Sequence, residues 1–276
     1  MSGPPLPDYH THTARCGHAQ GTAAEYVAAA REHGLAAIGV SDHLPVLHTS
    51  DPELSMGADE LGDYVAEVRR LQREAPGFVL LGIEADYHPT TVDAVAGLLA
   101  AHPFDYVIGS VHFLDDWGFD DPRTLDSWAR RDVDDVYLRY LEVLGDAAES
   151  GLFTILGHLD LVKKFGHRPK RPLESALGTL AGRLARAGVV VEVNTAGLRK
   201  PVGEIYPSVD WLRVLRAHGV PITFGSDAHR PDDVGADRAA ALAAARAAGY
   251  ADYAWLAPAD QNEPHTRAGV EIRPLP

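Results

Sequence analysis

The feature that most constrains the fold of this chain is a repeated alternation between short apolar runs and helical patterns. Apolar, β-rich runs predict buried strands at residues 36–41, 78–84, 106–111, 153–158, 189–193 and 222–225, and a weaker strand at about 8–11. Helical patterns follow at residues 22–33, 58–74, 91–101, 133–150, 173–187, 208–218 and 234–248. Such an alternation predicts an α/β fold whose parallel strands are joined by right-handed crossovers.

Local signals mark where these helices begin and end. Thr22 and Glu25 have the spacing of a capping box, and glycines such as Gly34, Gly151 and Gly188 follow the helical patterns. The chain has seven strand–helix units, one fewer than a regular α/β barrel. Two interpretations stay open: either one unit is degenerate, or the barrel is seven-stranded.

The chain reads as one domain. Its 276 residues would allow either one large domain or two smaller ones. No Gly/Ser-rich linker, sharp change in composition or internal repeat divides the sequence. We therefore predict a single domain over residues 1–276, in which the polar, proline-rich residues from about 250 onward wrap the outside.

Charge and cysteine content limit the possible partners and location. The chain has 25 Lys and Arg residues and 39 Asp and Glu residues, which gives a net charge of −14. Proteins that bind nucleic acids typically carry basic surface patches, so this acidic balance disfavours such a partner. Cys16 is the single cysteine, which suits a reducing cytoplasm. The sequence shows neither a signal-peptide pattern nor a long apolar run. We expect a cytoplasmic protein with a small-molecule partner, and with no nucleic-acid or membrane partner.

Residues that can bind metals stand at the carboxyl ends of the predicted strands. The chain has 14 histidines. The residues that follow the strands are His10, His12, His18, His43, Glu84, His112, His158, Asp227 and His229. In an α/β barrel this end of the strands carries the active site. Alternate residues of a strand share a face, so His10 and His12 can bind one ion.

The simpler interpretation of a single histidine is a hydrogen-bonded surface residue. We read six of the other seven histidines that way, namely His33, His48, His102, His167, His218 and His265, and His88 is less clear because it is near Glu84. Cys16 is read as a packed loop residue rather than a thiolate ligand. Nine ligand-type residues at one end of the strands predict a polynuclear metal site instead. Glu84 is the expected bridge, because a carboxylate offers two oxygens.

The pattern of these residues resembles the polymerase and histidinol phosphatase (PHP) family. The motifs are His10-Thr-His12, Cys16-Gly-His18-Ala, Asp42-His43, Glu84, Ser110-Val-His112, Gly157-His158 and Asp227-Ala-His229. The segments Trp117-Gly-Phe119-Asp and Asn194-Thr-Ala-Gly-Leu-Arg199-Lys are most similar to the histidinol-phosphatase type, which serves histidine biosynthesis. The resemblance spans about residues 8–240.

The resemblance implies a distorted (β/α)7 barrel with its active site at the carboxyl ends of the strands. It also implies three divalent metal ions. The first would be bound by His10, His12, Glu84 and Asp227, the second by Glu84, His112 and His158, and the third by His18, His43 and His229. Imidazole and carboxylate ligands suit Zn, Fe or Mn. The implied reaction is the hydrolysis of L-histidinol phosphate to L-histidinol and phosphate.

The expected catalytic residues are Glu84, Asp227 and His229. A bound metal lowers the pKa of water toward neutrality, so no phosphoenzyme intermediate is required. Either Asp227 or a metal-bound water would protonate the leaving alkoxide.

An acidic chain needs local cations to hold a phosphate ester. Arg199 is the first candidate because its guanidinium can contact phosphate through two bonds. Lys200, Arg230 and Arg15 are further candidates, and Trp117 is a candidate wall for the imidazole of the substrate.

Three alternatives stay open at this point. The first is another PHP-family phosphoesterase that acts on nucleotides or nucleic-acid ends, although the acidic charge disfavours it. The second is a non-catalytic metal-binding module. The third is an amidohydrolase on a similar barrel, in which a lysine would take the bridging role assigned here to Glu84.

Overall fold

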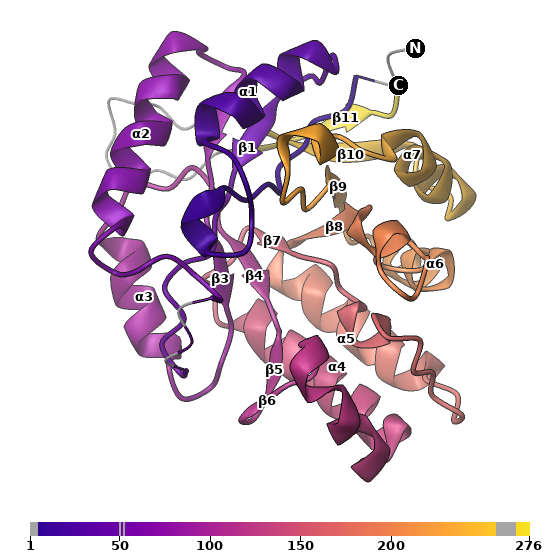
Figure 1. Ribbon diagram of the computed structural model, residues 1–276. Coiled ribbons are helices and arrows are strands. Elements are labelled where there is room, and N and C mark those ends of the chain that lie inside the picture. The colour runs from indigo at the N-terminus through magenta and orange to yellow at the C-terminus, as the bar shows by residue number, and fades with distance from the viewer. Residues whose placement is uncertain (1–4, 50, 52, 258–268) are drawn as a thin grey trace.

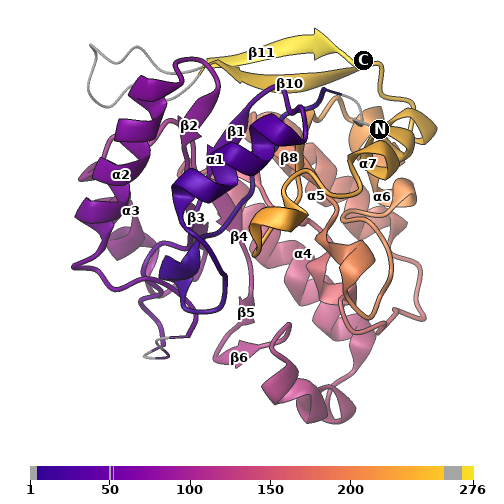
Figure 2. The same cartoon turned by 45° about the horizontal axis from the view of Figure 1, so that its top comes forward.

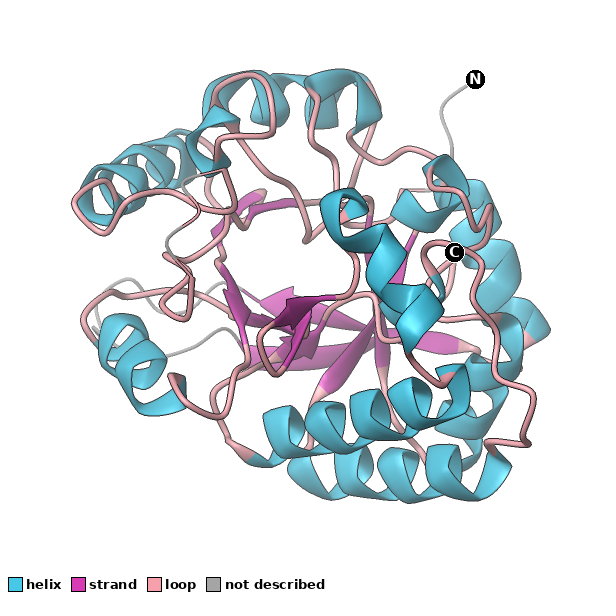
Figure 3. Cartoon of the chain, turned by 60° about the horizontal axis from the view of Figure 1, so that its bottom comes forward, coloured by secondary structure: helices cyan, strands magenta, loops and turns pink. Residues whose placement is uncertain are grey.

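Strands and helices alternate along the chain in the computed structural model, which describes residues 5–49, 51, 53–257 and 269–276. The helices are α1 (Ala23–Glu32), α2 (Leu61–Glu74), α3 (Val92–Ala100), α4 (Val133–Glu149), α5 (Glu174–Ala187), α6 (Val209–Ala217) and α7 (Arg238–Ala247). The strands that alternate with them are β1 (Ile38–Val40), β2 (Val79–Leu81), β3 (Glu84–Asp86), β4 (Ile108–Ser110), β7 (Ile155–Leu156), β8 (Val190–Asn194) and β9 (Ile222–Gly225). The strands lie in the middle of the molecule and the helices surround them (Figures 1 and 3).

The strands pair in parallel, as the alternation predicts. Among the described residues, β3, β4, β7, β8 and β9 form one sheet in that order, and β1 pairs with β2. The run predicted as one strand at 78–84 is observed as β2 followed by β3. A parallel bridge between His43 and Glu84 joins the end of β1 to β3.

Residues 8–12, which we call the first segment, lie between β1 and β9. Parallel bridges join Asp8 to Ile38 on one side and Thr11 to Ala228 on the other. The backbone N–H groups of His12 and Asp227 donate to Ala228 O at 2.9 Å and to His10 O at 2.8 Å. The predicted strand at about 8–11 is thus present as bridges in the part of the chain that the structure describes. These contacts place His10 and His12 beside Asp227.

The interior between the strands is filled by large side chains. Tyr106 is fully buried, and its hydroxyl donates to the backbone oxygen of Tyr9 at 2.5 Å. A Cβ atom added at Gly39 would lie 1.8 Å from the Tyr106 hydroxyl oxygen. Gly39 is therefore required by the close approach of this ring, and the strand interior is a packed core.

Two hairpins add to the alternating units. Strands β5 (Phe113–Leu114) and β6 (Trp117–Gly118) follow β4, and the 3-10 helix Pro122–Arg130 comes after them. Strands β10 (Asp252–Ala257) and β11 (Gly269–Pro274) pair in antiparallel fashion near the C-terminus. Figure 2 shows β10 and β11 across one end of the molecule and β5 and β6 at the opposite end.

β10 is packed against the start of the strands. The hydroxyl of Thr223 donates to Ala254 O at 2.9 Å, and the backbone N–H of Leu256 donates to the Tyr9 hydroxyl at 3.1 Å. Trp255 is buried, whereas Ile272 on β11 is exposed. Within the described residues, no helix is long and apolar enough to cross a membrane.

Candidate metal centre

Glu84 lies at the centre of the predicted ligands. It begins β3, and its side chain is 1% exposed. Five histidines contribute a nitrogen within 4 Å of its carboxylate oxygens, namely His10, His12, His43, His112 and His158. The hydroxyl of Ser110 donates to Oε1 of Glu84 at 2.5 Å. The carboxylate is therefore shared among several candidate ligands, as expected of a bridge.

One group of ligands combines the first segment with the residues after β9. Nε2 of His12 lies 3.3 Å from Glu84 Oε2 and 3.2 Å from Asp227 Oδ1. Nε2 of His10 lies 3.2 Å from Glu84 Oε2 and 3.8 Å from Asp227 Oδ1. Asp227 has a φ of 53°, a left-handed conformation that is uncommon outside glycine and often marks functional sites.

A second group lies on the other oxygen of Glu84. Nε2 of His158 is 3.1 Å from Glu84 Oε1, and Nε2 of His112 is 3.8 Å from the same atom. The rings of His112 and His158 have centroids 5.1 Å apart. These side chains follow β4 and β7, which are neighbours in the sheet.

A third group consists of His18, His43 and His229, whose ligand atoms lie within 4.8 Å of one another. The ring centroid of His18 is 4.9 Å from that of His229 and 5.3 Å from that of His43. His18 follows a short 3-10 helix at Ala14–Cys16, and the left-handed Gly17 (φ 84°) turns the chain before it. This group is more open to solvent than the other two.

The residues fit a set of divalent cations. Nε2 of His10, Nε2 of His12 and Oε2 of Glu84 are buried and have no hydrogen-bond partner among the described residues. A buried polar atom left without a partner costs about 1–3 kcal/mol. A metal ion would satisfy such atoms, and imidazole with carboxylate is a donor set that Zn, Fe and Mn accept.

The charge balance of the centre favours ionised carboxylates. Burial opposes ionisation of Glu84, but His43 and His10 outweigh it and hold its pKa well below the ordinary value. Burial likewise opposes ionisation of Asp227, and His10 with His12 holds that pKa well below its ordinary value. Burial, with a smaller contribution from His12, lowers the pKa of His229 to about 3. Burial opposes protonation of His10 and His12, but Glu192 beside His10 and Asp227 beside His12 outweigh it and raise the pKa of both imidazoles. A metal ion binds anionic carboxylates and neutral imidazoles, so its binding would displace these protons.

Three carboxylates that sequence reasoning did not assign to the site lie behind the histidines. Glu192 Oε1 is 2.8 Å from His10 Nδ1, and Asp86 Oδ1 is 2.8 Å from His112 Nδ1. Asp42 Oδ1 is more distant, at 3.8 Å from His12 Nδ1. In the sequence they are polar residues at strand ends, and the spacing of Asp86 from Glu84 indicates a shared strand face.

A cavity of about 300 Å³ opens beside the metal ligands. Its lining includes His18, His43, Glu84, His112, His158, Asp227 and His229, together with Lys164, Lys200, Asp120, Phe113 and Tyr206. Of the predicted substrate residues, Lys200 lines this cavity. Lys164 was not in the predicted set. Its Nζ lies 2.9 Å from Asp120 Oδ2, and no sequence motif marks that pairing.

The other predicted substrate residues are not among the described residues that line this cavity. Arg199 donates to Ser226 O at 2.6 Å and lies 3.3 Å from Asp237 Oδ2. Arg15 is paired with Glu67 at 2.9 Å, and Arg230 is exposed. Trp117 is buried, with the Arg131 guanidinium 3.9 Å from its ring centre. The structure therefore gathers the predicted metal ligands in one place, whereas four of the five predicted substrate-binding residues lie outside the cavity lining.

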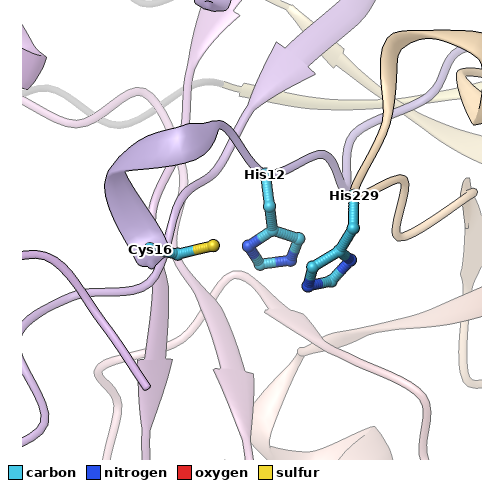
Figure 4. A group of neighbouring side chains, drawn as sticks. All are labelled: His12, Cys16 and His229. Atoms are coloured by element: carbon cyan, nitrogen blue, oxygen red, sulfur yellow. The ribbon is translucent and has the colours of Figure 1, made fainter. Parts of the chain in front are cut away.

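Cys16 lies beside the centre. Its sulfur faces the ring of His12, with His229 on the far side of that ring (Figure 4). The side chain is fully buried, and burial raises the pKa of its thiol to about 12. The ligand atoms of Cys16, His12 and His229 lie within 4.8 Å of one another, and an ion bound there would displace the thiol proton.

Comparison with known proteins connects this geometry to a family. A match to the PHP domain spans residues 8–196. A Deinococcus radiodurans protein named "Probable histidinol-phosphatase" is 44% identical over 234 residues, which cover 83% of this chain and 88% of that protein. The histidinol-phosphatase of Bacillus subtilis is 28% identical over 263 residues, covering 83% and 95% of the two chains.

A solved structure has a similar fold. It is a histidinol phosphate phosphatase from Lactococcus lactis complexed with zinc, L-histidinol and phosphate. The TM-score is 0.75 at 23% sequence identity, and the match covers 92% of this chain and 97% of that one. The similarity therefore extends over nearly the whole of both chains.

Proposed function

The chain belongs to the PHP family, and we propose that it is a metal-dependent phosphatase that hydrolyses L-histidinol phosphate to L-histidinol and phosphate in histidine biosynthesis. The observation that carries this proposal is the cluster of histidines around buried Glu84, which opens on a cavity with cationic side chains. The similarity to curated histidinol-phosphatases supports the choice of substrate.

The proposal assigns three divalent ions, Zn, Fe or Mn, to three sets of residues. These are His10, His12, Glu84 and Asp227; then Glu84, His112 and His158; and then His18, His43 and His229. When bound, such ions lower the pKa of water and neutralise charge on a phosphoryl group.

Protein side chains carry the rest of the chemistry. Glu84, Asp227 and His229 remain the proposed catalytic residues. Because the pKa of Asp227 is well below its ordinary value, its carboxylate is ionised at neutral pH. That charge suits Asp227 to the role of a ligand, and either Asp227 or a water molecule would protonate the leaving alkoxide.

The cavity offers complementary charges to the substrate. Lys200 and Lys164 are the described lysines in its lining, and we assign the phosphate dianion to them. Asp120 and Asp121 line the same cavity and suit the cationic amine of histidinol. Arg199, Arg230, Arg15 and Trp117 do not line the cavity, so they would contact the substrate only if their loops rearranged.

We also propose that the strands close into a barrel and that the chain forms one domain. The parallel bridges of the first segment to β1 and to the residues after β9 support a distorted, closed barrel of seven β/α units. We assign residues 1–276 to one domain. The net charge of −14 supports a small-molecule substrate over nucleic acid, and the single buried cysteine is compatible with a cytoplasmic enzyme.

A substrate panel at fixed metal concentration tests the proposal. A mononucleotide has the same phosphate dianion but no cationic amine, so the carboxylates of the cavity would stay uncompensated, and an uncompensated charge in a low-dielectric site is costly. We expect kcat/KM for L-histidinol phosphate to exceed that for mononucleotides at least about 10²-fold, or about 2.7 kcal/mol. Single-stranded DNA should not be degraded at a comparable rate. Preference for a nucleotide or a DNA end would favour a different PHP phosphoesterase.

A further inference from the structure

The histidines of the metal centre differ in the groups that contact the ring nitrogen facing away from the proposed ion. This inference rests on the metal sets of the proposed function. It concerns how tightly each set holds its ion, a property set by groups outside the ligands themselves. A carboxylate that accepts the second N–H of a ligating imidazole fixes its tautomer and raises its basicity, and loss of such a partner typically weakens metal binding about 10–100-fold.

Two of the four histidines in the inner sets, His10 and His112, have a carboxylate at Nδ1, whereas Nδ1 of His12 and of His158 has no hydrogen-bond partner among the described residues. His10 Nδ1 lies 2.8 Å from Oε1 of Glu192, which leaves Nε2 of His10 for the metal. His112 Nδ1 lies 2.8 Å from Oδ1 of Asp86, whose other hydrogen bond comes from the backbone N–H of His112 at 3.2 Å. Both contacts orient an imidazole toward Glu84.

Glu192 is held firmly in its position. It lies on β8, and its side chain is 2% exposed. Its Oε2 accepts from the backbone N–H of His158 at 2.9 Å and from Asn194 Nδ2 at 2.9 Å. The backbone of Gly225 leaves room for it, because a Cβ atom there would lie 1.8 Å from Glu192 Oε1. One carboxylate thus supports a histidine of the first metal set and the backbone of a histidine in the second.

The third set is backed by neutral groups. Nδ1 of His18 faces the backbone oxygens of Cys16 at 3.0 Å and Glu53 at 2.8 Å. Nδ1 of His229 faces the backbone oxygen of Asp227 at 3.0 Å, and its side chain is 29% exposed. His43 is the exception, since its Nδ1 lies 3.0 Å from Glu84 Oε2.

The Glu84 carboxylate that faces His43 is shared with histidines of the other two sets. The two oxygens of Glu84 also contact His10, His12 and His158, which belong to the first two sets. The third set contains imidazole ligands alone, whereas each of the other two includes at least one anionic carboxylate. An anionic ligand offsets the charge of a buried dication and a neutral imidazole does not, so the third set has less charge compensation than the other two.

We propose that the three metal sets bind with graded affinity. The ion held by His18, His43 and His229 exchanges readily with solution, and Glu192 is a positioning residue that tightens binding by the inner sets. In metal-limited conditions the inner sets are occupied while the outer set is empty. Supply of the third ion would then limit the fraction of active enzyme.

Metal release from the zinc-loaded full chain tests this directly. Excess 4-(2-pyridylazo)resorcinol is added, and its zinc complex is followed by absorbance. We expect two phases, with about one ion per chain in the fast phase. His18→Ala should remove the fast phase and leave the slow one. Glu192→Gln should accelerate the slow phase about 10–100-fold and leave the fast one.

Asp105→Asn is the matched control. Asp105 is another fully buried carboxylate, but it is bonded to Arg69 and Gln72 rather than to a metal ligand. It should leave both phases unchanged, and circular dichroism of each variant checks that it is folded. A single release phase in the parent protein would overturn the proposal. So would equal effects of Glu192→Gln and Asp105→Asn on the slow phase.

Release needs no substrate, so this outcome is independent of the substrate panel. A protein with two release phases that ignores L-histidinol phosphate would refute the proposed function alone. A histidinol-phosphatase with one release phase would refute the graded affinity alone.

Discussion

Oε1 of Glu84 lies 3.1 Å from Nε2 of His158, and both side chains are buried, with Glu84 at the start of β3 and His158 just after β7. The opposite oxygen of the same carboxylate faces His10 and His12. Loss of its charge would therefore affect two proposed ions at once. We expect Glu84→Gln to lower kcat/KM by about 10²-fold or more, the scale found when one electrostatic stabiliser is removed.

The control for that variant is His48→Ala. His48 stacks on His88 with ring centroids 4.5 Å apart, and it is not one of the proposed ligands. Its removal should leave activity within a few-fold of the parent. Equal losses in the two variants would mean that the centre has been misplaced.

Chelation should abolish activity, because the proposed chemistry depends on bound ions. Elemental analysis of fully loaded protein should find more than two metal ions per chain, given the three sets of ligands. Full activity with fewer than two ions per chain would contradict the three-metal proposal. Zinc, iron and manganese should each be added back separately to identify which metals restore the rate.

Lys200→Ala should weaken transition-state binding, since Lys200 lines the cavity. A hydrogen bond to a charged group contributes about 1.5–3 kcal/mol, which predicts a fall in kcat/KM of about 10- to 100-fold with metal content unchanged.

Arg199→Ala is the matched comparison, because Arg199 is the adjacent cation and is bonded to Ser226 O. We expect a smaller loss than for Lys200→Ala. A larger loss in Arg199→Ala would show that its loop rearranges to place the guanidinium on the phosphate.

The pair of Asp120 and Lys164 should make stability depend on pH. Burial alone would raise the pKa of Asp120, but Lys164 and His112 outweigh it and lower that pKa in the folded state. The resulting stabilisation is fully present above the unfolded value of about 3.9 and is lost as pH falls through the lowered folded value. The thermal unfolding temperatures of the parent protein and of the Asp120→Asn variant, both metal-free, should differ most at neutral pH. A difference that grows on acidification would contradict this.

Gly225→Ala should destabilise the protein because the new Cβ atom would lie 1.8 Å from Glu192 Oε1. Overpacking of this kind costs about 1–3 kcal/mol. Gly178→Ala on α5 is the control, since nothing lies within 4 Å of a Cβ there, and it should stabilise the helix. Urea denaturation measures both, and a neutral Gly225→Ala would show that Glu192 can move.

The sequence was most informative where local spacing decides the outcome. The parallel pairing of strands followed from the alternation of apolar runs and helices, and His10, His12, Asp227 and His229 were identifiable because strand ends meet at one edge. The capping box of Thr22 and Glu25 is likewise present at the start of α1.

Features that depend on loop conformation were not predictable in the same way. Arg199 and Lys200 are adjacent in sequence, yet Lys200 lines the cavity while Arg199 is bonded to a backbone oxygen. The pairing of Lys164 with Asp120 joins two loops that are far apart in the chain. Strands β5 and β6 are too short for a periodic pattern, and β10 and β11 lie in the polar, proline-rich part of the chain that was expected only to wrap the outside.

The bridge between Thr11 and Ala228 has a consequence for synthesis of the protein. His12 leaves the ribosome early, but Asp227 and His229 emerge only after most of the chain has been translated. Contacts between such distant residues form late and slowly. A nascent chain therefore displays parts of the first and third proposed sets long before it can complete them. Binding of an ion by these two sets must wait until residues far apart in the sequence have met.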